Sequence, residues 1–326
     1  MIGLASYLAF FLTLALILGI ATMGLNRLGG AAGNFHGGVA AFFGAGAYGL
    51  MLAGGPARAD GLGGFGLPWP VAMLAGSALA GLLALAVGLL TARLRHDYLA
   101  IATFGVSVAL EAVARNAEWL TGGARGLRGF PRPFEATVGD PFLYGLGFCA
   151  FVALCAAAVY AGLERTLRSP FGRLLRAVRE DETAARALGK SPARARLEAF
   201  VLGSMITGLA GALYGMFYAF VSPQDIAPIL TFQIWAMLIV GGAGNNAGAL
   251  LGALVVWAGW TGSGWALAAW APREWQLYAG TVQYILIGIV IVGALLWRPR
   301  GLAPERLAVS TAATLAPRPT MTGEVR

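Results

Sequence analysis

The stretch Ser169–Tyr214, SPFGRLLRAVREDETAARALGKSPARARLEAFVLGSMITGLAGALY, begins basic and polar and ends in a long apolar run. Serine at an N-cap and proline at the first helical position both favour a helix start. The pairs Ser169-Pro170 and Ser191-Pro192 therefore predict two helices, separated by a break at Gly189. One face of the first helix carries apolar residues at helical spacing: Phe171, Leu174, Leu175, Val178, Ala185 and Leu188. Arginines on the opposite face predict a short amphipathic helix outside the bilayer, held by a partner on the cytoplasmic side.

The rest of the chain is too apolar for a soluble domain. Apolar residues make up 58% of its 326 residues, charged residues 12%, and the mean hydropathy is +0.72. Because a helix needs about 20 apolar residues to cross a bilayer, we expect an all-α integral membrane protein, a polytopic helical bundle of about 8–9 transmembrane segments, some short or broken. The predicted spans are Leu4–Thr22, Val39–Leu52, Val71–Ala92, Tyr98–Ala114, Phe142–Leu163, Leu197–Phe220, Ile229–Val240, Ala247–Trp260 and Thr281–Trp297. The second, seventh and eighth are short and rich in glycine, which is compatible with broken or re-entrant segments.

The net charge of +8 is distributed unevenly along the chain. With the basic segment assigned to the cytoplasm, alternation of the spans places 17 of the 23 Lys and Arg inside. The remaining six fall outside: Arg58, Arg115, Arg125, Arg128, Arg132 and Arg273. This bias predicts an outside N-terminus and a cytoplasmic C-terminus. It also argues against a nucleic-acid binder, which would gather its basic residues on a water-exposed module.

The chain has one membrane domain, residues 1–300, in which residues 164–196 form the cytoplasmic loop. Met1–Tyr7 carries no basic n-region, so the first apolar run is kept as a span and not as a signal peptide. Residues 301–326 lack periodicity and are expected to form a disordered cytoplasmic tail. A long external connection, Arg115–Pro141, is too irregular for a helix. It is either a landing surface for a soluble substrate-binding protein or a solvated loop.

Two glycine-rich interruptions resemble each other: GGAAGNFHGG at Gly29–Gly38 and GGAGNNAG at Gly241–Gly248. Interrupted helices in transporters expose backbone groups to a substrate, whereas glycine also lets membrane helices pack closely. On the first interpretation, the candidates for the translocation path are Gly33, Asn34, His36, Gly241, Gly244 and Asn245.

Several short motifs are typical of enzymes, but the sequence around each of them does not fit that function. Gly44, Gly46 and Gly49 have dinucleotide-binding spacing but lie in an apolar helix, where close packing explains them better. Gly189-Lys190 lacks the earlier glycine of a phosphate-binding loop, so we expect ATP to be bound by a partner. We find no catalytic constellation, no cofactor motif and no metal-ligand cluster. Glu111, inside a span, is expected to pair with Arg115 one turn later.

The basic segment resembles the loop by which permease subunits of ABC importers dock on their ATPase. Ala184, Ala185 and Gly189 match its pattern of two alanines, three residues and a glycine. Where many importers carry Glu, this chain has Thr183. The sequence around this pattern resembles the sequences of the branched-chain amino acid permease family. So do GLNRLGGAAGNFHGGVAAFFGAGAYG, LRHDYLAIATFGVSVALEAV, LTGGARGLRGFPRP, LIVGGAGNNAGALLGALVV and WRPRGL, in the same order. The resemblance implies that the ATPase-coupling residues are Glu180, Asp181, Glu182, Ala184, Ala185 and Gly189.

The same resemblance implies a permease that imports branched-chain or related amino acids across the bacterial inner membrane. Its partners would be a second homologous permease, two cytoplasmic ABC ATPases, an extracytoplasmic substrate-binding protein and membrane lipid. Within the family, urea or a short amide is an alternative substrate. From other classes, an ion-coupled secondary carrier is weaker, because no chain of buried carboxylates or histidines supports a proton relay. An intramembrane enzyme is weaker still.

Overall fold

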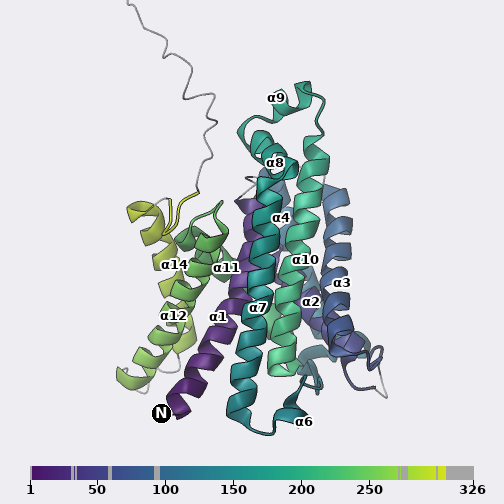
Figure 1. The fold of residues 1–326 in the computed structure, drawn as a ribbon, viewed down its shortest axis with the longest axis vertical. Helices are drawn as coiled ribbons and strands as arrows, with labels where there is room; N and C mark the ends of the chain where they lie inside the picture. Colours follow the sequence, from purple (N-terminus) through teal and green to yellow (C-terminus); the bar gives the residue numbers. More distant parts are fainter. Residues whose placement is uncertain are drawn as a thin grey trace, which may run out of the picture.

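A computed structural model describes residues 2–30, 33, 35–57, 61–91, 96–270, 272, 278–298 and 300–305. These residues form a helical bundle with one two-stranded pairing (Figure 1). The long helices are α1 (Ile2–Gly29), α3 (Trp69–Thr91), α4 (His96–Asn116), α7 (Pro141–Arg168), α10 (Pro192–Tyr218), α12 (Asn246–Trp270) and α14 (Ala279–Trp297). All seven are long and apolar enough to cross a membrane. The predicted class, a polytopic all-α membrane protein, is confirmed.

Two shorter apolar helices correspond to the second and seventh predicted spans. They are α2 (Val39–Gly54, 16 residues) and α11 (Ile229–Gly241, 13 residues). The eighth span is longer than predicted, because α12 continues for a further ten residues past Trp260 and reaches 25 residues in all. Its glycines and serine do not interrupt the helix. Both glycine-rich interruptions therefore lie in connections between helices, α1 to α2 and α11 to α12.

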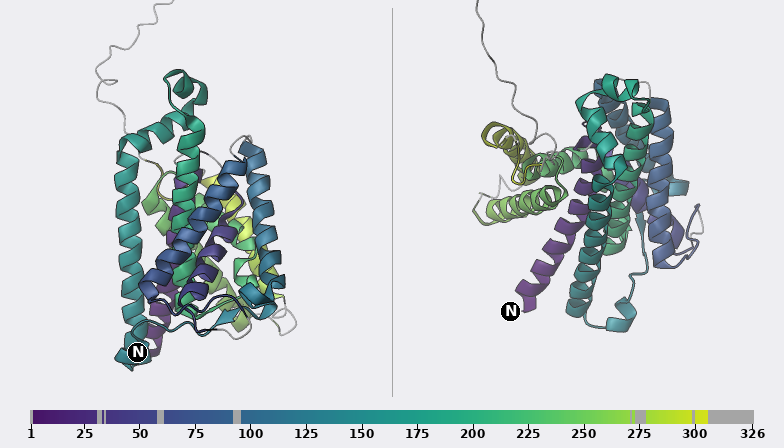
Figure 2. Two further views of the ribbon diagram at one scale, coloured as in Figure 1. Left: turned by 90° about the vertical axis from the view of Figure 1, so that its right-hand side faces the viewer. Right: turned by 45° about the horizontal axis from the view of Figure 1, so that its top comes forward.

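Helix α1 runs through the middle of the molecule. It packs against α10 and α7 on one side and against α11 and α12 on the other. Figure 2 shows α12 and α14 set apart from the helices around α10, with α1 crossing between the two groups. The buried side chains of α1 include Ile17, Ile20, Met23 and Leu25, all fully enclosed.

Close backbone contacts hold α2, α3 and α10 together. A Cβ atom on Gly46 would overlap the carbonyl of Gly208 in α10, and one on Gly49 would lie 2.8 Å from the Cα of Gly76 in α3. The glycine triplet with dinucleotide-binding spacing is thus a helix-packing surface, as predicted, because only glycine permits this approach.

The connection between α4 and α7 is more ordered than the sequence suggested. It contains two single helical turns, α5 (Glu118–Thr121) and α6 (Glu135–Val138), a 3₁₀ turn η1 (Gly123–Arg125) and strand β1 (Leu127–Arg128). Strand β1 pairs antiparallel with β2 (Phe220–Val221), just after α10, followed by η2 (Pro223–Ile226). The pairing joins the connection to the end of α10 at the pole of the bundle opposite to the basic segment.

The basic segment lies at the other pole. There α7 is followed by α8 (Pro170–Glu180) and α9 (Glu182–Ala187), which form the top of the molecule in Figure 1. The C-terminal ends of α1 and α14 lie toward the same pole. The opposite pole holds the end of α4, η1 and β1, which carry Arg115, Arg125 and Arg128 respectively.

Candidate functional site

Helices α8 and α10 both begin at Ser-Pro, as predicted. Ser169 and Ser191 hold the N-cap positions, and Pro170 and Pro192 the first helical positions. The expected side-chain caps do not form among the described residues. The Ser169 hydroxyl instead donates to the carbonyl of Thr166, at 2.6 Å, so it binds the end of the preceding helix.

The predicted single helix from Ser169 to Gly189 is wrong in one respect, since it is divided at Asp181. Helix α8 ends at Glu180, and the Asp181 carboxylate accepts from the N–H groups of Thr183 at 2.8 Å and Ala184 at 2.9 Å. Asp is among the favoured N-caps, and here it starts α9. The second break, at Gly189, is where the sequence placed it, with φ of +73°.

The six predicted coupling residues lie around the tip formed by α9. Glu180, Asp181, Ala184 and Gly189 are exposed, Ala185 is buried, and Glu182 is half-buried. The Glu182 carboxylate pairs with Arg186, at 2.7 Å, and with Arg196 of α10. Leu188, predicted on the apolar face of one continuous helix, is 79% exposed and follows α9, which the break at Asp181 separates from α8. The tip therefore presents an exposed leucine, two exposed acidic side chains, Glu180 and Asp181, and a glycine.

Beneath α8, Arg27 near the end of α1 is buried. The sequence analysis counted Arg27 among the 17 positive charges on the cytoplasmic side, and the structure shows that it is only 2% exposed. Its guanidinium lies 5.0 Å from the centroid of the Phe171 ring and donates to the Thr166 hydroxyl at 3.2 Å. This contact joins α1 to the start of α8, and stacking on an aromatic face suits arginine. Its Nε and Nη2 have no hydrogen-bond partner among the described residues.

The two glycine-rich connections meet at this pole. The N–H of Gly244 donates to the Asn26 side-chain carbonyl at 2.8 Å, and a Cβ on Gly30 would overlap the same Asn26 oxygen. The Asn26 amide then donates to the side chain of Asn246 at 2.9 Å, and that of Asn246 to Glu164 of α7 at 3.3 Å. A series of side-chain hydrogen bonds thus connects α1 to α12 and α7. The sequence analysis did not single out the residues that form it.

The proposed path residues of the first connection lie beside α8 and α11. Gly33 has φ of +72°, and a Cβ there would be 2.7 Å from the Cγ of Arg179. His36 is 4% exposed, its ring lies 5.3 Å from that of Phe200, and its Nδ1 has no partner among the described residues. Its backbone carbonyl accepts from the Trp235 indole N–H at 3.0 Å. Asn34 lies outside the described residues.

In the second connection, Gly241 ends α11 and a Cβ there would overlap the carbonyl of Gly248 in α12. Gly244 has φ of +88° and faces the carboxylate of Glu305. The Asn245 side chain donates to the carbonyl of Pro304 at 3.3 Å and accepts from the N–H of Ala247 at 3.0 Å. Residues 301–305 of the expected tail therefore pack on this connection, while residues 306–326 lie outside the described part.

A cleft of about 630 Å³ opens between α7, α8 and the second connection. Its lining residues are Tyr160, Glu164, Leu167, Arg168, Arg173, Arg176, Gly244, Asn245, Ala247, Ala303 and Glu305. Three arginines and two glutamates give it mixed charge. Within the described part of the chain, no group of three or more His, Cys, Asp or Glu is arranged to hold a metal ion.

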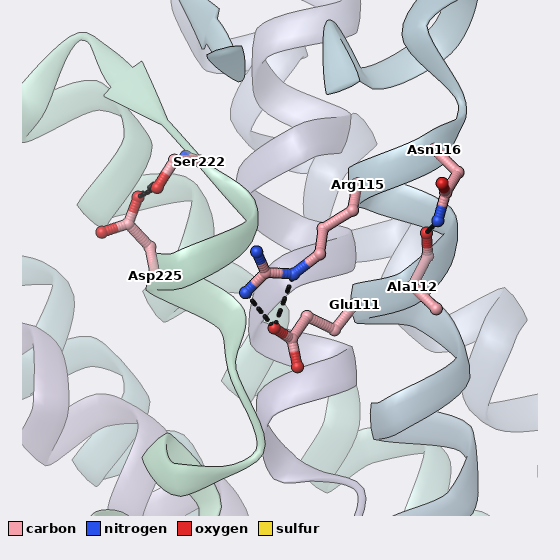
Figure 3. Close-up of polar contacts among 6 residues, drawn as sticks. All are labelled: Glu111, Ala112, Arg115, Asn116, Ser222 and Asp225. Carbon is pink, nitrogen blue, oxygen red and sulfur yellow. Dashed lines mark hydrogen bonds and ion pairs between the residues drawn. The ribbon is translucent and has the colours of Figure 1, made fainter. Parts of the chain in front are cut away.

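The opposite pole carries local ion pairs. Arg115 binds Glu111 at 2.6 Å, which confirms the pair predicted one turn apart (Figure 3). Nearby, the Asp225 carboxylate accepts from the hydroxyl and N–H of Ser222, both at 2.7 Å, and from the Tyr214 hydroxyl at 2.8 Å. The Ser-x-x-Asp spacing of 222–225 is a capping-box signature that the sequence analysis could have used.

Comparison with known proteins identifies relatives over most of the chain. The family described as branched-chain amino acid transport system, permease component, matches residues 7–295. The high-affinity branched-chain amino acid transport permease LivM of Escherichia coli is 31% identical over 313 residues, 90% of this chain and 69% of that protein. A probable LivM of Methanocaldococcus jannaschii is 30% identical over 240 residues, 70% of this chain and 67% of that protein.

The high-affinity branched-chain amino acid transport permease LivH of Escherichia coli is 25% identical over 161 residues, 49% of this chain and 47% of that protein. No solved structure matches the chain. The family match covers the bundle from α1 to α14, including the basic segment and both glycine-rich connections. The chain belongs to the branched-chain amino acid transport system permease family.

Proposed function

We propose that this chain is the permease subunit of an ABC importer that carries branched-chain amino acids, powered by ATPases bound at α8 and α9. One observation carries the proposal: the connection between α7 and α10 consists of two polar helices, α8 and α9, and carries an exposed tip with Leu188, Asp181 and Gly189. Because these polar helices project beyond the ends of the long apolar helices, they lie within reach of a water-soluble partner (Figure 1).

The proposed assembly contains a second permease, because both LivM and LivH of one bacterium are similar to this chain. In this assembly the α8 pole faces the cytoplasm and the N-terminus faces outside, which follows the positive-inside rule. The connection between α4 and α7, at the far pole, would receive a substrate-binding protein. The two glycine-rich connections, with Gly33, Asn34, His36, Gly241, Gly244 and Asn245, would line the cytoplasmic part of the path.

Uptake of radiolabelled leucine by cells that express the chain with its partner subunits tests the energy source. We expect ATP depletion to abolish uptake and an ionophore to leave it intact. The reverse result would identify an ion-coupled carrier. Competition by unlabelled valine and isoleucine, but not by urea, would assign the substrate class, whereas competition by urea alone would overturn it.

A matched pair of glycine variants tests the docking tip. Gly189→Val should abolish uptake while the permease stays folded in the membrane, because a β-branched side chain is strained at φ of +73° and enlarges the docking surface. Gly66→Val is the control, since Gly66 also has positive φ, at +62°, and open space around it, but lies in the α2–α3 connection. Normal uptake by the Gly189 variant would remove the coupling role of this tip.

A further inference from the structure

The C-terminal strap, defined here as residues Arg300–Glu305, folds back over the α11–α12 connection. Two of its N–H groups donate to carbonyls at the end of α11, at 2.9 Å each: Leu302 to Val240 and Ala303 to Gly241. Gly301 has φ of +71° and lies so close to Gly242 that a Cβ would not fit. The strap is therefore joined to the connection by main-chain bonds.

Arg179, in the last turn of α8, binds the strap and α1 at the same time. One guanidinium nitrogen donates to the carbonyl of Gly30 at 2.6 Å, just past the end of α1. The other donates to the carboxylate of Glu305 at 2.9 Å. The two charged side chains are 24% and 21% exposed, so this is a half-buried pair and not a surface one.

The planar fork of arginine explains why one side chain can hold two acceptors in different segments. Lysine presents its charge at a point and would not fix both distances together. Charge-assisted hydrogen bonds are also stronger than neutral ones. The aliphatic stem of Arg179 fills the space that a side chain at Gly33 would need. The first glycine-rich connection is thus shaped around this arginine.

These contacts make a continuous route from the docking tip to the second group of helices. Movement of α8 would pull on Gly30 directly and on α11 and α12 through Glu305 and the strap. Arg27 holds the start of α8 to α1, but it has no contact with the strap among the described residues. Arg179 is therefore the residue through which both glycine-rich connections are joined to α8.

We infer that Arg179 and Glu305 are positioning residues for transport: their contact makes the C-terminal strap part of the coupling between ATP hydrolysis and the helices α11 and α12. The inference rests on the proposed function, since it needs an ATPase that moves α8. It adds that residues 300–305, which follow the last span, take part in transport.

The test uses the complete complex, purified and reconstituted with its ATPases and binding protein, and compares leucine uptake with ATP hydrolysis. Glu305→Gln and Arg179→Lys should both leave assembly and hydrolysis unchanged and lower uptake per ATP about tenfold, within the usual range of coupling between sites. Glu198→Gln is the matched control, because it removes an exposed pair with Arg194 at the same pole. It should not change the ratio.

The double variant separates a shared contact from two unrelated defects. If Arg179 and Glu305 act through one contact, the double variant should lose no more coupling than the worse single variant. Additive losses, or single variants with an unchanged ratio of uptake to ATP hydrolysis, would overturn the inference.

A further variant covers the case in which Glu305→Gln fails to assemble. Glu305→Asp keeps the charge on a shorter side chain, so it should assemble and lower the ratio of uptake to ATP hydrolysis. An unchanged ratio would overturn the inference. A wild-type complex without ATP-driven uptake would instead overturn the proposed function.

Discussion

At the scale of single residues, the informative side chains are the polar ones inside an apolar bundle. Asn26 and Asn246 are each 2% exposed, and they bind each other across 220 positions of sequence. Hydrogen bonds between membrane helices stabilise modestly, since the unfolded chain in the bilayer also finds partners. The main effect of the bond between Asn26 and Asn246 is to fix the position of α12 against α1.

Loss of the Asn246 side chain tests this contact. Asn246→Ala leaves the Asn26 amide and the Glu164 carboxylate without their shared partner, and should lower the free energy of unfolding by about 1 kcal/mol. Denaturant titration in detergent micelles measures the change. The control is Asn116→Ala, an exposed asparagine whose side chain donates within its own helix to the carbonyl of Ala112 (Figure 3), and it should change the free energy of unfolding by no more than about 0.5 kcal/mol. Equal effects would show that this buried series of hydrogen bonds adds nothing to stability.

At the scale of elements, glycine determines how closely α2, α3 and α10 approach. Gly46→Ala should lower the free energy of unfolding by about 1–3 kcal/mol, because its methyl group would overlap the backbone of Gly208. Gly105→Ala in α4 meets no atom within 4 Å and should instead raise it slightly, by about 0.5–1 kcal/mol, since alanine restricts the unfolded chain. Thermal unfolding of both variants and of the wild type in the same detergent measures these two changes. A Gly46 variant as stable as wild type would mean that these helices can separate freely.

The helices were predictable because their signals are local. Apolar runs fixed the spans, and Ser-Pro with Gly189 fixed the limits of the docking segment. The division at Asp181 was missed because an apolar face continued through it, although the residue is a good N-cap. The burial of Arg27 and the meeting of Asn26 with Asn246 were not predictable, since both depend on contacts between distant helices. The predicted eighth span ended at Trp260, where the apolar run gives way to Thr261, Gly262 and Ser263, whereas α12 continues through these residues to Trp270.

At the scale of the whole molecule, the two poles differ in charge and in construction. Cysteine labelling tests which pole faces the cytoplasm. In intact cells a membrane-impermeant reagent should leave Arg176→Cys and Arg186→Cys unmodified and should modify Arg125→Cys, which is exposed at the other pole. Permeabilised cells should show labelling at all three positions. Modification of the first two from outside would invert the topology and remove the ATPase-docking proposal with it.

The exposed leucine at the outermost turn of the tip has a consequence for the affinity between subunits. Leu188 is 79% exposed in the isolated chain, and single exposed apolar residues are common on protein surfaces. Once the proposed ATPase covers this side chain, removing its apolar area from water would contribute about 1.5–3 kcal/mol to binding. Leu188→Ser should therefore weaken the binding of the ATPase and leave the free energy of unfolding of the permease alone within about 0.5 kcal/mol.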